Sequence, residues 1–196
     1  MPRKKSFSLK TFLHKTFRRL ERFVFLLKSL LTPRQFIYFS CVLVGISSAL
    51  AVIILKTFAH WVYKSSQKLD DIFHLPYSNS TLPIIGIIIT VIIVKKVLDG
   101  SIEKGTAQIM YAVAKKRGIM PRKQMFAQII TSSFTVGMGG SAGLESPITI
   151  TGAAFGSNYA QNYRLSYKDR TLLLACGVAA GIGAAFNAPI AGVLFA

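Results

Sequence analysis

Long uncharged stretches alternate with short polar ones along this chain, and the first two of them are predominantly apolar. Phe36–Leu55 contains no charged side chain and its apolar character continues to Trp61, while Leu82–Leu98 forms a second run with lysines only near its end. A helix that crosses a lipid bilayer needs about 20 apolar residues. Both runs therefore predict transmembrane helices, and Pro33 stands where the first is expected to begin.

Three further uncharged stretches, residues 126–144, 146–163 and 171–196, are rich in small residues. Glycines four residues apart recur in them: Gly139 and Gly143, Gly152 and Gly156, Gly177 and Gly181. In lipid, small residues at that spacing let helix backbones approach closely. We therefore predict close helix packing, above all at the second and third pairs.

Charge is distributed unevenly along the sequence. Hydrophobic residues make up 52% of the chain, yet Lys and Arg number 24 against 7 Asp and Glu. The basic residues gather in the first 34 positions and in 95–123. By the positive-inside rule, the N-terminus and 95–123 are expected on the cytoplasmic side and the loop 64–81 outside. The composition excludes a disordered chain, and without a base-reading module no nucleic-acid partner is expected.

Residues 1–33 are expected to form a basic cytoplasmic segment. Within it, residues 7–31 place apolar side chains at helical spacing, with lysines and arginines on the other side. This pattern predicts an amphipathic helix that lies on the anionic inner leaflet. The alternative is a solvated tail in which the apolar residues fall at helical spacing by chance.

The residue types that most often carry catalysis or bind metals form no recognisable group. Cys41 and Cys176 both lie inside apolar runs without a pairing pattern, and we interpret them as small buried hydrophobes. The three histidines are scattered along the chain. No metal site, cofactor or catalytic constellation is therefore expected, and the chain is not predicted to be an enzyme.

Glu145 is the only charged residue between positions 126 and 163. It follows the glycine-rich segment 139–143, and Pro147 suits the first turn of a new helix. A carboxylate at membrane depth is costly and marks a functional site, while the free amides of a helix start attract anions. We interpret Glu145 as a carboxylate that occupies an anion site and leaves it on protonation. The alternative is a buried helix-capping carboxylate with no role in transport.

Two motifs resemble those of the CLC family of chloride channels and chloride/proton antiporters. The first is Gly143-Leu144-Glu145-Ser146-Pro147, where the family has G-(K/R)-E-G-P. The second is the run 177–195, GVAAGIGAAFNAPIAGVLF. The resemblance covers roughly residues 34–196. It implies a multi-pass, all-α integral membrane protein, built from the broken, tilted helices of the first inverted repeat of a CLC-type transport domain.

The resemblance also implies positions for the later helices. Short helices are expected at 105–117, 121–138, 146–161, 169–184 and from 188 onward. The basic cluster within 115–123 is then expected at the cytoplasmic face.

The resemblance further implies roles for individual residues. Glu145 would be the gating glutamate, which competes with chloride and, in the antiporters, carries protons. Anion binding would fall to two segments, which comprise Gly143, Leu144, Ser146, Pro147 and Ile148 around the glutamate, and Gly105, Thr106 and Ala107 as the nearest counterpart of the family's G-S-G-I-P motif. Gly100-Ser101-Ile102 is a weaker competitor for that motif, and Thr106 as an ordinary helix cap is the alternative. Leu144 replaces the family's basic residue, which alters electrostatics at the outer mouth.

The function implied is transport of chloride or a similar small anion, by a voltage-gated channel or a chloride/proton antiporter. The partners implied are chloride, protons, the lipid bilayer and a second copy in a full-length homodimer, with no cofactor. A non-transporting membrane-packing or assembly subunit is the alternative. Because the chain stops at Ala196 within an apolar run, residues 34–196 are expected to be the N-terminal half of a longer domain and not to conduct alone.

Overall fold

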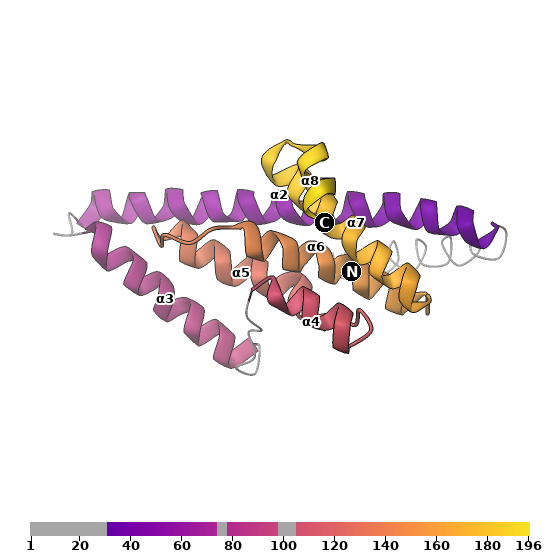
Figure 1. The fold of residues 1–196 in the computed structure, drawn as a ribbon. Coiled ribbons are helices and arrows are strands. Elements are labelled where there is room, and N and C mark those ends of the chain that lie inside the picture. The colour runs from indigo at the N-terminus through magenta and orange to yellow at the C-terminus, as the bar shows by residue number, and fades with distance from the viewer. Residues whose placement is uncertain (1–30, 74–77, 98–104) are drawn as a thin grey trace, which may run out of the picture. The chain divides into compact units, whose positions relative to one another are not determined.

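The computed structural model describes residues 31–73, 78–97 and 105–196. Within these ranges every regular element is a helix, in agreement with the predicted all-α class (Figure 1). The helices are α2 (Pro33–Phe73), α3 (Ser78–Val97), α4 (Ala107–Lys115), α5 (Gln124–Gly137), α6 (Glu145–Asn162), α7 (Tyr167–Phe186) and α8 (Pro189–Phe195). The predicted amphipathic helix over 7–31 and the competitor motif 100–102 lie outside the described residues.

The chain divides after Ser40, and all packing described below lies within Cys41–Ala196. The five helices predicted after residue 104 are each found to within three residues of the expected limits. The prediction that residues 64–81 form a loop is wrong in extent, because α2 continues to Phe73 and α3 already begins at Ser78. No glycine or proline occurs between residues 46 and 75, so nothing in that stretch interrupts the helix.

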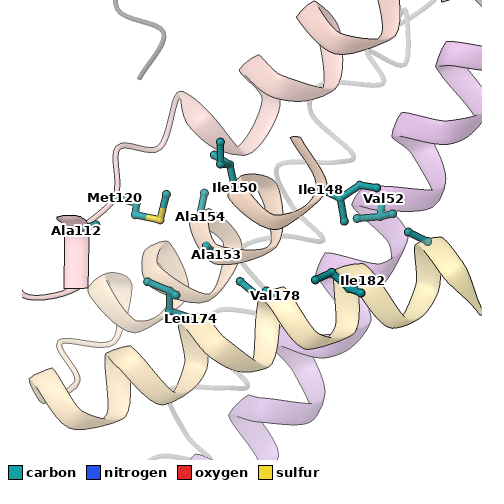
Figure 2. Close-up of a cluster of buried hydrophobic side chains, with 11 residues drawn as sticks. Val52, Ala112, Met120, Ile148, Ile150, Ala153, Ala154, Leu174, Val178 and Ile182 are labelled. Carbon is teal, nitrogen blue, oxygen red and sulfur yellow. The ribbon is translucent and has the colours of Figure 1, made fainter. Parts of the chain in front are cut away.

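Helix α6 is the most deeply buried element of the unit. Small and apolar residues of α6 occur on every face of the helix. A helix without a distinct polar face is typically buried. Its Ile148, Ile150, Ala153 and Ala154 form the centre of the main core cluster. Figure 2 shows this cluster, in which side chains from α2, α4 and α7 and from the α4–α5 loop meet those of α6.

Glycines bring α6 and α7 into backbone contact, as the four-residue spacing predicted. A Cβ atom placed on Gly177 would lie 2.1 Å from the carbonyl oxygen of Gly152, and one on Gly156 would lie 2.1 Å from the carbonyl oxygen of Leu173. As residue numbers rise along α6, those of the contacting residues on α7 fall. The two helices therefore run antiparallel. Only glycine, whose side chain is a hydrogen atom, fits at these positions.

Helices α2 and α7 also lie side by side. A Cβ atom on Gly45 would be 3.7 Å from Cβ of Ala180, Val52 lies close to Gly181, and the ammonium group of Lys56 donates to the carbonyl oxygen of Ala185 at 2.6 Å. Residue numbers rise together along both helices, so α2 and α7 run parallel.

The two cysteines meet across this pair of helices. The side chains of Cys41 and Cys176 lie close enough to interact, and both are free and half-buried. Cys41 packs against the core cluster that contains Val44 and Leu173, as expected of a small hydrophobe, but the proximity of the two cysteines was not predicted. Their separation of 135 positions in the sequence gave no sign of the pairing, because only the parallel packing of α2 on α7 brings them together.

Mild oxidation is expected to join Cys41 to Cys176. In the membrane-reconstituted protein, copper phenanthroline should convert the two thiols to one disulfide, because their side chains lie close together. Mass spectrometry of unreduced peptides would identify the linked pair. The matched control combines Cys41→Ala with Val42→Cys, because Val42 is 62% exposed and its side chain leaves α2 in a different direction. Cross-linking in the control as efficient as in the wild type would contradict the packing of α2 on α7.

Apolar side chains cover the outer surface of several helices. Helix α3 exposes Ile84, Ile87, Ile88 and Ile92, each by about half. Among the described residues, α2 and α7 are long and apolar enough to cross a membrane. An exposed apolar surface of this kind is typical of helices that contact lipid.

Candidate functional site

The segment between α5 and α6 begins with a tight glycine turn. Gly139 has φ of +89°, a region that side chains other than glycine rarely adopt. A Cβ atom on Gly140 would lie 2.5 Å from the carbonyl oxygen of Thr135, to which the Gly140 N–H donates at 2.9 Å. These two glycines end α5 and direct the chain toward the first turn of α6.

Contacts with two other helices hold the end of α5 in place. The hydroxyl of Ser66 on α2 donates to the carbonyl oxygen of Gly137 at 3.3 Å. The hydroxyls of Thr90 on α3 and Thr135 on α5 are 3.0 Å apart. A Cβ atom on Gly137 would also lie 2.7 Å from Cβ of Val62. The turn that leads to Glu145 is therefore attached to rigid elements.

Helix α6 begins at Glu145 with its first amides available to a ligand. The N-cap residue Leu144 makes no side-chain capping bond, and the first N–H groups of a helix have no partner within the helix. The Glu145 side chain is exposed, and no hydrogen bond or ion pair to it is found within the described part of the chain. This geometry does not support the alternative of a buried capping carboxylate.

Helix α4 begins beside the start of α6. Gly105 has φ of +66°, and a Cβ atom placed on it would lie 3.9 Å from the hydroxyl oxygen of Ser146. Thr106 is the N-cap residue of α4, but its hydroxyl makes no capping bond. The alternative of Thr106 as an ordinary hydroxyl cap is therefore not supported. Two segments about forty residues apart in the sequence thus bring together two helix starts that have no side-chain cap.

The remaining predicted site residues differ in how accessible they are to a ligand. Gly143 and Ala107 are exposed, and a Cβ atom on Gly143 would find no atom within 4 Å. Pro147 and Ile148 are buried, so any contact they make with an anion is through the backbone. Leu144 packs against the core cluster that contains Leu55, and its side chain therefore serves packing.

The opposite end of α6 is tied to the loop between α4 and α5. The Ser157 hydroxyl accepts from the Met120 N–H at 2.9 Å and donates to the Gly118 carbonyl oxygen, while the Gln161 amide donates to the Met120 carbonyl oxygen at 3.1 Å. The basic residues of 115–123 therefore lie near the C-terminal end of α6, where cations favourably meet the helix dipole. These contacts at Ser157 and Gln161 lie about 18 to 24 Å along α6 from Glu145.

Sequence reasoning missed two polar residues, one in the first turn of α4 and one on α2. Gln108, in the first turn of α4, is only 6% exposed. Lys56, within the apolar stretch of α2, caps the carbonyl end of α7 through its bond to Ala185. The signal in each case was one long polar side chain surrounded by apolar neighbours, which indicates a specific partner.

Comparison with known proteins adds an independent finding. Residues 84–196 match the family model described as voltage gated chloride channel. The chain is 38% identical over 96 residues to a ClcB-like chloride channel protein of Ralstonia nicotianae, with 47% of this chain and 22% of that protein covered.

Two further relatives are similar to part of this chain. Identity is 40% over 91 residues with chloride channel protein CLC-c of Arabidopsis thaliana, covering 40% of this chain and 12% of the relative. Identity is 36% over 92 residues with the H+/Cl− exchange transporter ClcA of Salmonella arizonae, covering 46% of this chain and 20% of the relative. The matched part spans 12–22% of the length of these three relatives.

Proposed function

This chain belongs to the voltage gated chloride channel family, and from that premise we propose that it forms part of a transmembrane pathway for chloride or a similar small anion. Two of the relatives named above are called chloride channels and one an exchange transporter. The pathway therefore works as a channel or as a chloride/proton exchanger, and transport rather than enzymatic catalysis is the activity proposed.

The observation that carries this proposal is the meeting of the α4 and α6 starts. Gly105 lies beside Ser146, and neither helix has a side-chain cap. Helix starts carry partial positive charge and free N–H donors, so two of them side by side favour an anion more than one does. Pro147 contributes no N–H, which leaves the amides of Glu145 and Ser146 as donors on α6.

We assign Glu145 the role of the gate in this pathway. Its exposed carboxylate begins α6, so it has access to the same donors as a dissolved anion. An ionised Glu145 competes with chloride for the donors, and protonation removes that competition. The unused hydroxyl of Thr106 is available to the same anion from the α4 side.

The membrane arrangement follows from charge. We propose that the basic loop 115–123 and the N-terminus lie on the cytoplasmic side, as the positive-inside rule requires. Glu145, at the other end of α6, then lies deeper in the membrane or toward its outer face. A homodimer is the proposed state of the complete protein. A purely packing function explains the glycine contacts of α6 and α7 but leaves the paired uncapped helix starts without a purpose.

Chloride efflux from liposomes tests the proposed function. The complete protein is reconstituted into vesicles loaded with potassium chloride, and efflux is started with valinomycin and followed with a chloride electrode. We expect efflux well above that of protein-free vesicles. Proton uptake that accompanies the efflux identifies an exchanger, and its absence identifies a channel. Efflux no faster than in empty vesicles would overturn the proposal and favour a packing role.

A further inference from the structure

Gln108 is a buried polar side chain without a partner. It is 6% exposed, and neither its Nε2 nor its Oε1 atom forms a hydrogen bond within the described part of the chain. Burying an amide without hydrogen bonds costs free energy, so such groups are uncommon and usually have a partner that the protein alone does not supply. A leucine of similar size would fill this position without that cost.

The position of Gln108 directs its amide toward the two helix starts. It is the second residue of α4 and lies four positions before Ala112, so the two residues share one side of the helix. Ala112 packs into the core cluster with α6, which identifies this side as the one facing α6. Helical side chains lean toward the N-terminus of their helix. The amide is thereby aimed at the end of α4 where Gly105 adjoins Ser146.

We propose that the side-chain amide of Gln108 donates a hydrogen bond from Nε2 to the anion held between the starts of α4 and α6. The proposal rests on the proposed function and adds a ligand from a side chain to donors that otherwise come from the backbone and Thr106. A neutral amide suits this position, because it binds an anion without holding it as strongly as a buried cation would. Gln108 thus contributes to the affinity and selectivity of the site.

Chloride binding by a leucine variant tests this assignment. The complete protein in detergent is titrated with sodium chloride against sodium gluconate at constant ionic strength, and thermal unfolding is recorded at each concentration. We expect chloride to raise the unfolding temperature of the wild type. In Gln108→Leu, the apparent Kd for chloride should be about tenfold higher, the change expected for one lost hydrogen bond to a charged group. Without chloride, the same variant should unfold at a higher temperature than the wild type.

Gln161→Leu is the matched control at the other end of α6. Its amide is already bonded to Met120 and Ser157, so its loss should lower the unfolding temperature and leave the Kd for chloride unchanged. Gln108→Met, with an unbranched side chain of similar length, replaces the leucine variant if that one does not fold. An unchanged Kd in the Gln108 variants would overturn the role of Gln108 alone. A wild type that does not respond to chloride would overturn the anion site itself and with it the proposed function.

Discussion

Replacing Glu145 with glutamine is expected to abolish the pH dependence of chloride flux and any proton transport coupled to it. Glutamine has nearly the same size and shape but does not titrate, so the α6 start loses the one side chain that can alternate between occupying and leaving the anion site. In liposomes containing the complete protein, we expect flux through the variant to change less than about twofold between about pH 4 and pH 8, because an amide does not titrate.

Asp169→Asn is the matched control for this prediction. Asp169 lies in the first turn of α7, where its carboxylate accepts from the Ser166 hydroxyl at 2.7 Å and its N–H donates to the same hydroxyl. The exchange of acid for amide there should cost some stability and leave the pH profile of flux as in the wild type. If Glu145→Gln retains the wild-type pH profile and proton coupling, Glu145 is not the gate.

Replacing Gly177 with alanine is expected to destabilise the packing of α6 on α7 by about 3 kcal/mol, at the upper end of the usual cost of overpacking. The added Cβ atom would lie 2.1 Å from the carbonyl oxygen of Gly152, and a backbone atom cannot move aside as a flexible side chain can. The higher helix propensity of alanine recovers only about 1 kcal/mol. The unfolding temperature and the yield of monodisperse protein measure the effect.

Gly143→Ala tests whether the destabilisation expected for Gly177→Ala comes from a steric clash or from the loss of a glycine as such. A Cβ atom at Gly143 would find nothing within 4 Å, and its backbone does not have a positive φ. We therefore expect the unfolding temperature of this variant to stay close to that of the wild type. Equal destabilisation by both substitutions would show that the contact between Gly152 and Gly177 does not control stability.

Local sequence determined much of this fold. The helix start at Glu145 could be predicted because a glycine-rich break precedes it and Pro147 follows in the first turn. The close approach of α6 and α7 could be predicted because glycine spacing reports directly on a backbone contact. The length of α2 was underestimated because hydropathy locates the part of a helix that suits a membrane and says nothing of where a polar extension ends.

Features that depend on contacts between distant helices were beyond sequence reasoning. The pairing of Cys41 with Cys176 requires the parallel alignment of α2 and α7. The meeting of Gly105 and Ser146 follows only when α4 is placed against α6. Gln108 looked like one polar residue in a short helix until its burial on the side facing α6 was known.

The glycine contacts between α6 and α7 restrict how α6 can move. Gly152 faces Gly177 and Gly156 faces Leu173 at backbone distance, so sliding α6 by one turn along α7 would press Cβ atoms of other residues against carbonyl groups. The two helices consequently move as one rigid body. If Glu145 is the gate, as proposed, its opening and closing are then confined to rotation of the Glu145 side chain about its own bonds, a change of a few ångströms on a fixed backbone.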